Sequence, residues 1–240
     1  MRLDQELVRR KLCESRQEAR ECISSGDVVV NGLVIKKQSK DLGEETALEV
    51  LKKRKFVSRG GDKLEGALKY IYHDLQKDFF REKIALDVGS STGGFTDCLL
   101  QYGVKSVAAV DVGTSQLHAS LRNKPEVTLF ETTDIRNFSS TTKFNIIVVD
   151  VSFIALEKII DTIISFGVDE AEYFLLVKPQ FEVGFGNTKK GIVKEATLVD
   201  LVLKKYKLLL AEKNYKVITV IPSIIQGKNG NQEYFLYCKK

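Results

Sequence analysis

The sequence predicts an α/β protein with a mostly parallel sheet whose last strand is antiparallel, preceded by a small α+β domain. From residue 59 onward, short apolar segments alternate with amphipathic helical segments, which is typical of a parallel sheet covered by helices. The break between the last two apolar segments is short, so these two strands should pair antiparallel. With 43% apolar and 29% charged residues among 240, the chain is long enough for a full core and is not disordered.

The composition excludes several classes of protein. The 37 basic residues exceed the 32 acidic ones only slightly, for a net charge of +5, which by itself indicates no partner. The four cysteines form no Cys-x-x-Cys pair and there are only two histidines, so we expect reduced cysteines and no metal. The first residues include acids where a secretory signal has an apolar stretch, and no apolar run is as long as a membrane span. We therefore expect a cytoplasmic protein without stable membrane insertion.

Residues 1–51 form the predicted small domain. Ser15 begins a capping box that opens the second of two helices, and Gly26 ends that helix. The dipeptide Asn31-Gly32 between two apolar runs is the strongest short-range signal for a hairpin. The predicted elements are helices around residues 3–8 and over 16–26, and strands over 28–30, 33–35 and 47–51.

A basic run follows this domain and forms the predicted linker, residues 52–58. The basic side chains here are Lys52, Lys53, Arg54 and Lys55. Such a cluster is either a solvated surface or a contact with nucleic acid. Arg16 and Arg20 are four residues apart and therefore share one face of the second helix.

The first domain resembles the S4 RNA-binding domain. The matching positions are Ser15, Arg16, Ala19, Ile23, Gly26, Val28, Val30, Asn31 and Gly32. The resemblance implies RNA binding through Arg16, Arg20 and the nearby basic side chains.

Residues 59–240 form the second predicted domain, in which strands and helices alternate. An amphipathic helix over 63–75 comes first, and a strand over 84–88 leads into a glycine-rich turn and a helix that ends near Leu100. Further strands are predicted over 106–112, 127–130, 144–151, 173–177, 215–221 and 233–238, and a long helix over 196–213. Repeated strand–helix units give a mostly parallel sheet with helices on both faces.

The turn after the strand over 84–88 is the candidate ligand site. Glycines let the backbone approach a ligand closely, and open α/β sheets bind ligands at the carboxyl ends of their strands. Ser91 stands where the dinucleotide-binding pattern requires its second glycine, so the turn suits a smaller adenosyl ligand. The alternative is a tight strand–helix turn that binds nothing.

Acidic residues at the ends of successive strands complete a predicted nucleoside pocket. Asp87 could meet a cationic or amino group, Asp111 the two ribose hydroxyls, and Asp134 an adenine amino group. The candidate cofactor-binding residues are Asp87, Gly89, Ser91, Gly93, Gly94, Phe95, Asp111 and Asp134.

Four segments resemble the TlyA family, whose second domain is an FtsJ-like methyltransferase. They are residues 58–64, 87–97, 150–153 and 177–182. The resemblance covers essentially the whole chain and implies a Rossmann-like methyltransferase sheet with S-adenosylmethionine as the cofactor. It also implies methylation of a ribose 2′-hydroxyl in ribosomal RNA, with ribosomal subunits as the partner and cytidines of the small or large subunit, or both, as targets.

The FtsJ-like enzymes use a Lys-Asp-Lys-Glu tetrad, which the resemblance places at Lys63, Asp150, Lys178 and Glu233. A ribose 2′-hydroxyl is a poor nucleophile until its proton is drawn off. We therefore assign Lys178 as the base, with Asp150 and Lys63 as orienting and tuning groups. Glu233 would hold a lysine or the ribose.

A glycine-rich, basic segment over 181–194 follows the proposed base and contains Lys189 and Lys190. It is either a mobile loop that clamps RNA or a solvated surface loop. Two other functions remain open. Members of the TlyA family are also labelled hemolysins, which suggests a membrane-active protein, but the sequence shows no signal, no membrane span and no long basic amphipathic helix with a Trp/Phe-rich apolar face. An RNA-binding protein with an inactive methyltransferase domain would carry most of the same motifs.

Overall fold

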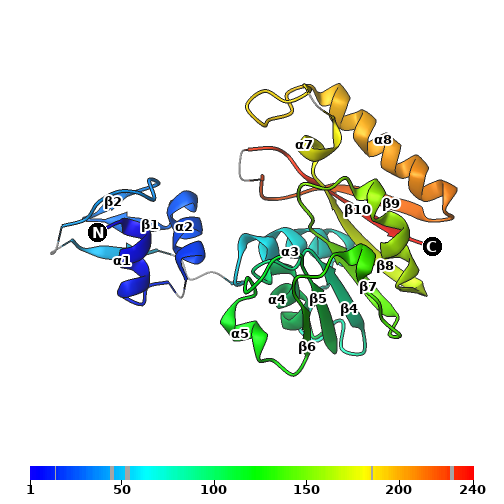
Figure 1. The fold of residues 1–240 in the computed structure, drawn as a ribbon, viewed down its shortest axis with the longest axis horizontal. Coiled ribbons are helices and arrows are strands. Elements are labelled where there is room, and N and C mark those ends of the chain that lie inside the picture. The colour runs from blue at the N-terminus through cyan, green and yellow to red at the C-terminus, as the bar shows by residue number, and fades with distance from the viewer. Residues whose placement is uncertain (14, 44–45, 52–54, 185, 228–229) are drawn as a thin grey trace. The chain divides into compact units, whose positions relative to one another are not determined.

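The computed structural model describes residues 1–240 except 14, 44–45, 52–54, 185 and 228–229. The chain divides into two compact units, Met1–Ser58 and Arg59–Lys240, and each is considered by itself (Figure 1).

The first unit packs two helices on a small antiparallel sheet. Its core consists of apolar side chains from both helices and from the central strand, among them Leu3, Leu7, Ile23 and Val28. The Ser15 hydroxyl accepts a hydrogen bond from the Glu18 amide at 3.1 Å, as the predicted capping box requires. The elements are α1 (Leu3–Arg9), α2 (Arg16–Ser25), β1 (Val28–Val30), β2 (Leu33–Val34) and β3 (Leu48–Val50), with the strand order β2-β1-β3.

Two buried carboxylates of α1 each hold several arginines of the first unit. Asp4 is fully buried and forms ion pairs with Arg2, Arg16 and Arg20 at 3.0, 3.1 and 3.0 Å. Burial alone would raise the pKa of Asp4, but the hydrogen bonds from the three guanidinium groups outweigh it and lower that pKa to about 2. Glu6 is paired in the same way with two further arginines of this unit.

The second unit is built on one seven-stranded sheet with the order β6-β5-β4-β7-β8-β10-β9. The strands from β6 to β8 in this order pair in parallel, and β10 pairs antiparallel with both of its neighbours. The predicted fold class is therefore confirmed, including the antiparallel last strand. The strands are β4 (Ile84–Val88), β5 (Ser106–Val110), β6 (Val127–Phe130), β7 (Phe144–Val149), β8 (Gly167–Val177), β9 (Lys216–Pro222) and β10 (Tyr234–Lys239).

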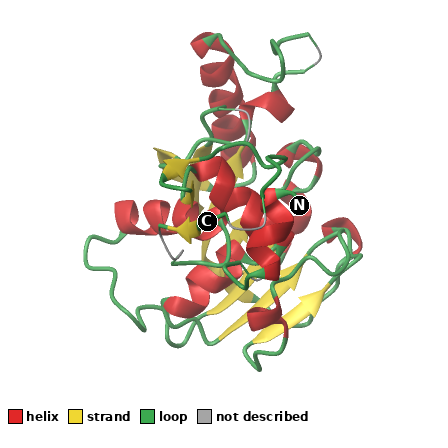
Figure 2. Cartoon of the chain, turned by 90° about the vertical axis from the view of Figure 1, so that its left-hand side faces the viewer, coloured by secondary structure: helices red, strands yellow, loops and turns green. Residues whose placement is uncertain are grey.

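Helices pack against both faces of this sheet, and Figure 2 shows the helices and strands of the chain from a second side. Side chains of α6 and α8 belong to the same buried cluster as Leu86, Ile147 and Leu175 on one face. On the other face, Thr96 of α4 donates a hydrogen bond to Asp87 of β4. The helices are α3 (Arg59–Ile71), α4 (Gly94–Gln101), α5 (Ala119–Arg122), α6 (Ile160–Ser165), α7 (Pro179–Glu182) and α8 (Ala196–Glu212), and the 3₁₀ turns are η1 (Ile135–Asn137) and η2 (Leu156–Lys158).

Several element boundaries differ from those predicted. The first helix of this unit begins at Arg59 rather than at residue 63. The sequence predicted a later start because two glycines, which have low helix propensity, occupy the first turn. The fifth strand begins at Gly167 rather than at residue 173. Its first half was not predicted because three acidic residues interrupt the apolar pattern there. The short helices α5, α6 and α7 span too few residues to produce a helical period. Among the described residues, no helix is long and apolar enough to cross a membrane.

We expect Asp4→Asn to destabilise the first unit by on the order of 2 kcal/mol at neutral pH, because it removes a buried partner of three arginines. The folded-state pKa of Asp4 lies below its ordinary value of 3.8, so the carboxylate stabilises the fold above that value. This contribution should be lost as the pH falls through about 2. The free energy of unfolding in urea, measured from neutral to acidic pH, checks both effects.

Glu49→Gln serves as the matched control because Glu49 is an exposed acid of the same unit. It should leave the urea midpoint and its acid dependence almost unchanged. Equal behaviour of the two variants would show that the buried Asp4 cluster does not stabilise this unit.

Candidate active site

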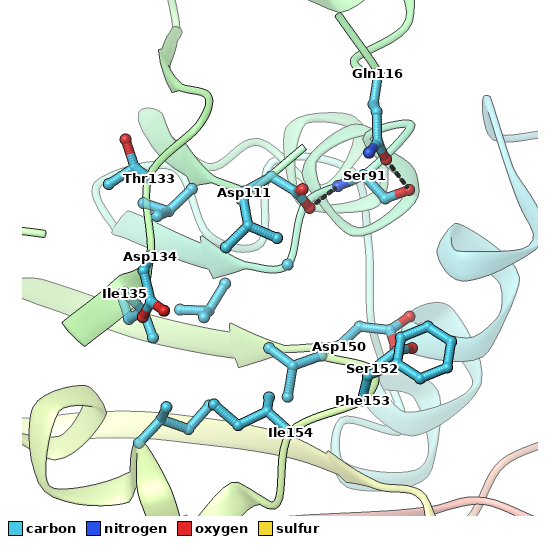
Figure 3. A pocket seen from close by; sticks show the side chains of 16 residues that line it. Ser91, Asp111, Gln116, Thr133, Asp134, Ile135, Asp150, Ser152, Phe153 and Ile154 are labelled. Carbon is cyan, nitrogen blue, oxygen red and sulfur yellow. Dashed lines mark hydrogen bonds between the residues drawn. The ribbon is translucent and has the colours of Figure 1, made fainter. Parts of the chain in front are cut away.

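A pocket of about 330 Å³ lies at the carboxyl ends of β4, β5, β6 and β7 (Figure 3). This is the edge where open α/β sheets bind their ligands. Four of the predicted cofactor-binding residues line the pocket, namely Gly89, Ser91, Asp111 and Asp134. Lining side chains that the sequence reasoning did not select include Gln116, Thr133, Ser152, Phe153 and Ile154.

The turn after β4 requires glycine where its backbone lies close to the end of β7 and to α5. Gly89 has φ +82°, and a Cβ atom there would lie 2.6 Å from the Asp150 carbonyl oxygen. Gly93 has φ +92°, and its Cβ would lie 2.5 Å from a methyl group of Leu121. Both positions therefore exclude larger side chains for steric and conformational reasons. The backbone at the end of β4 therefore lies close to Asp150, which directly follows β7.

Asp111 ties the turn after β4 to the loop after β5. Its Oδ2 accepts a hydrogen bond from the Ser91 amide at 2.8 Å, and its Oδ1 accepts one from the Gly113 amide at 2.6 Å. The Ser91 hydroxyl also donates to Gln116 Oε1 at 3.1 Å (Figure 3). Each carboxylate oxygen retains a further lone pair, so Asp111 can still accept from a hydroxyl.

Asp134, at the opposite side of the pocket, is paired with Arg136. The guanidinium group contacts the two carboxylate oxygens at 3.0 and 2.6 Å. These hydrogen bonds lower the pKa of Asp134 to about 2, so the group is a carboxylate at neutral pH.

The other four predicted cofactor residues do not line the pocket. Asp87 is fully buried and accepts a hydrogen bond from Thr96 Oγ1 at 2.6 Å, and burial raises the pKa of Asp87 to about 7. Phe95 packs against Phe235 with ring centroids 5.9 Å apart. Gly93 and Gly94 form the start of α4. Two buried polar atoms near the end of β4 have no hydrogen-bond partner, Asp87 Oδ1 in the strand and Ser90 Oγ in the turn after it.

The four predicted catalytic residues form two ion pairs with little exposure to water. Lys63 Nζ of α3 lies 2.5 Å from Glu233 Oε2, directly before β10. Lys178 Nζ, directly after β8, lies 2.5 Å from Asp150 Oδ1 and donates to Ser152 Oγ at 2.9 Å. Asp150 Oδ1 has no hydrogen-bond partner, so its contact with the lysine is an ion pair of poor hydrogen-bond geometry. Both lysines are 9% exposed and Glu233 is 3% exposed.

Phe153 is the most exposed large apolar side chain at the rim of the pocket. Its side chain is 90% exposed, and its backbone has φ +65°, in the left-handed region that non-glycine residues rarely adopt. Its ring lies 5.0 Å from the ring of Phe181. A phenylalanine shortly after an apolar strand suggests a core residue, so the sequence pattern gave no signal for this position beyond the 150–153 segment itself.

The predicted RNA-binding residues lie in three places. Arg16 and Arg20 pair with Asp4 and keep 48% and 41% of their side chains exposed. Lys55 Nζ lies 5.1 Å from the ring of Phe56, whereas Lys52, Lys53 and Arg54 lie outside the described residues. Lys189 and Lys190 are exposed in the loop between α7 and α8.

Asn231, shortly before β10, fastens this loop. Its side chain accepts from the Val193 amide at 3.0 Å and donates to the Gly191 carbonyl at 2.8 Å. Figure 1 shows the yellow α7–α8 loop beside the red connection between β9 and β10. The basic loop is thus attached to the segment that leads into Glu233.

The described cysteines are buried thiols without disulfides. Potential ligand atoms of Cys13, Glu18 and Cys22 in the first unit lie within 4.8 Å of one another. Because both cysteines also belong to the apolar core of that unit, the grouping is accounted for by packing. The expectation that the protein needs no metal stays a prediction.

Residues 56–240 match the model of the FtsJ-like methyltransferase family, and residues 1–48 match that of the S4 domain. The 16S/23S rRNA (cytidine-2′-O)-methyltransferase TlyA of Mycobacterium tuberculosis is 38% identical, over 99% of this chain and 89% of that protein. Hemolysin A of Brachyspira hyodysenteriae is 36% identical, over 99% of both chains.

Solved structures agree with these matches. The structure named "Putative hemolysin from Streptococcus thermophilus" is 34% identical, covers 100% of this chain and 88% of its own, and superposes with a TM-score of 0.77. The FtsJ-like match covers more than half of the chain and contains the pocket and both ion pairs. The chain belongs to the FtsJ-like methyltransferase family and carries an N-terminal S4 domain.

Proposed function

We propose that this protein transfers a methyl group from S-adenosylmethionine to a ribose 2′-hydroxyl of ribosomal RNA, with a cytidine as the target nucleotide. The observation that carries the proposal is the pair of nearly buried lysine–carboxylate contacts, one of which includes Asp150 at the lining of the strand-end pocket. Relatives named as rRNA (cytidine-2′-O)-methyltransferases, from Mycobacterium tuberculosis and Campylobacter jejuni, support the choice of substrate. On this account the protein works on ribosomal subunits in the cytoplasm.

The two units divide the work. Residues 1–51 form the RNA-binding domain, 52–58 the basic linker and 59–240 the methyltransferase domain. The exposed parts of Arg16 and Arg20, together with the basic linker and the loop lysines, would contact RNA phosphates.

The residues around the pocket fit S-adenosylmethionine. The close backbone at Gly89, the acceptor Asp111 and the carboxylate of Asp134 match the amino-acid, ribose and adenine parts of that molecule. The unpartnered Asp87 Oδ1 and Ser90 Oγ are buried polar atoms that still need a partner, direct or through water. When bound, the cofactor supplies a methyl group already activated by a sulfonium, so the protein must mainly align the acceptor.

Lys178 is the residue best placed to act on the ribose hydroxyl. It lies at the end of β8 beside Asp150, which lines the pocket, and Ser152 orients its Nζ. Asp150 keeps the lysine in place, while Lys63 and Glu233 hold a second charged pair at the same edge of the sheet. Only the neutral amine of Lys178 has a free lone pair, so in that form it would accept the proton of the 2′-hydroxyl as the methyl group is transferred.

The exposed ring of Phe153 would provide a stacking surface for the target base. An aromatic side chain at the rim of a pocket can hold an unpaired nucleotide by stacking, independently of its sequence. Its contact with Phe181 would fix the ring in place.

Asp111→Asn should weaken S-adenosylmethionine binding by about tenfold, because a charged acceptor in the pocket is replaced by a neutral amide. Calorimetric titration of the folded variant measures this. The exposed Asp74, outside the pocket, gives a matched control in Asp74→Asn. Unchanged affinity of the Asp111 variant would remove Asp111 from the cofactor site.

In a variant shown to be folded, replacing both Arg16 and Arg20 by Gln, which adds no carboxylate beside the buried Asp4, should weaken RNA binding and reduce its salt dependence by about two counterions, since fewer phosphate contacts form. Cofactor affinity should stay the same. RNA binding at a series of salt concentrations tests this, and an unaltered slope would mean that this face does not touch RNA.

Lys178→Ala should lower single-turnover methylation of ribosomal subunits by about a hundredfold or more, with cofactor and RNA affinity retained. Lys178→Arg should fail as well, because a guanidinium keeps its proton. Near-native rates for the Arg variant would reduce Lys178 to a positioning cation. If the parent protein itself showed no methyl transfer, a hemolysin or an RNA-binding protein with an inactive methyltransferase domain would be favoured instead.

A further inference from the structure

The segment that follows Asp150 adopts a conformation that needs support from outside. Phe153, near its middle, lies in the left-handed region at φ +65° and exposes 90% of its side chain. Such backbone strain in a non-glycine residue persists only where surrounding contacts hold it. Figure 3 shows Asp150, Ser152 and Phe153 together at one side of the pocket, with Ile154 below them. We call residues 151–156 the rim segment.

The contacts that hold the rim segment come from α7 and from Lys178 before it. Lys178 Nζ donates to Ser152 Oγ, and the Phe181 ring packs against Phe153. Glu182 Oε1 accepts a hydrogen bond from the Leu156 amide at 3.1 Å, at the start of η2. A carboxylate that accepts from a backbone amide forms a stronger hydrogen bond than a neutral acceptor does.

Glu182 is itself fixed from the other side. Its Oε2 accepts a hydrogen bond from the Tyr206 hydroxyl of α8 at 2.5 Å. Tyr206 is fully buried, and its hydroxyl oxygen accepts from the Glu157 amide at 3.3 Å. The carboxylate therefore joins three elements that meet beside the proposed active site: α7, η2 and α8.

We propose that Glu182 is a positioning residue for methyl transfer, which holds the rim segment against α7 so that Asp150, Ser152 and Phe153 are in place when the target nucleotide binds. The inference rests on the proposed function for its effect on rate. Glu182 does not line the pocket, so it acts through the residues that it holds and not on the cofactor. Small displacements of aligned groups are costly in a reaction that depends on in-line geometry.

Two substitutions of Glu182 separate positioning from general loss of structure. Glu182→Ala should lower the single-turnover methylation rate on ribosomal subunits by about tenfold or more, while the affinity for S-adenosylmethionine stays within about twofold of the parent. Glu182→Gln keeps an acceptor oxygen for the Leu156 amide and should restore most of the rate. Tyr206→Phe, which removes the hydroxyl that fixes Glu182, should give a smaller loss in the same direction.

The matched control is Leu210→Ala, in the same helix as Tyr206 and fully buried. It should lower the unfolding temperature without slowing methyl transfer at a temperature where the variant is folded. If Leu210→Ala slowed the reaction as much as Glu182→Ala at equal stability, the rate loss would follow stability, and the positioning role would be wrong.

Amide hydrogen exchange of peptides that cover residues 151–158 gives a readout that does not depend on catalysis. Glu182→Ala should speed exchange there and leave peptides of β4 and β5 unchanged, whereas Leu210→Ala should not act selectively on the rim segment. Unchanged exchange in the rim segment would overturn the inference even in an active enzyme. A parent protein that methylates no ribosomal RNA would overturn the proposed function, while the exchange result would still decide whether Glu182 holds the segment.

Discussion

The candidate site depends on one constraint: two lysine ammonium groups are almost removed from water, and each must therefore have a carboxylate partner. A buried charge without a partner is strongly destabilising, whereas a buried pair with good contacts is tolerated. Lys63 and its partner Glu233 are 170 residues apart in the chain, so their contact needs the completed fold. The order β8-β10-β9 places the antiparallel last strand beside β8, and this brings Glu233 to the edge where Lys178 also lies. The charge pairing thus depends on the sheet topology.

Segments beside the two ion pairs are held by hydrogen bonds to the same carboxylates and to a neighbouring one. Gln180 Nε2 donates to Glu233 Oε1 at 3.3 Å, so the helix that directly follows Lys178 of one ion pair contacts the glutamate of the other. Glu182 at the end of α7 reaches η2 and α8. One four-residue helix therefore connects both charged pairs to the rim of the pocket. In the first unit, buried Asp4 and Glu6 organise arginines by the same physical principle, and there the guanidinium groups stay partly exposed and available to a polyanion.

Much of this arrangement could be predicted from the sequence, because strands with long apolar runs, the capping box and the Asn31-Gly32 turn are local signals. The tetrad could be placed only through the family resemblance, since a strand-end aspartate or a surface lysine has no distinctive local pattern. Other features arise from tertiary contacts alone. Asp87 was expected to line the pocket, but its carboxylate accepts a hydrogen bond from Thr96 outside the pocket. The alternation of side chains along β4 turns it toward α4. The contacts of Glu182 and Phe153 form only when α7 packs on the rim segment, so the spacing of residues in the sequence could not predict them.

The central claim is that the two ion pairs and the adjoining pocket form a site for ribose 2′-O-methylation. The most direct measurement incubates the purified protein with ribosomal subunits and S-adenosylmethionine that carries an isotopic label in its methyl group. Mass spectrometry of the digested RNA then identifies the labelled nucleoside. We expect the label in 2′-O-methylcytidine. Label on a base, or no label in either ribosomal subunit, would contradict it.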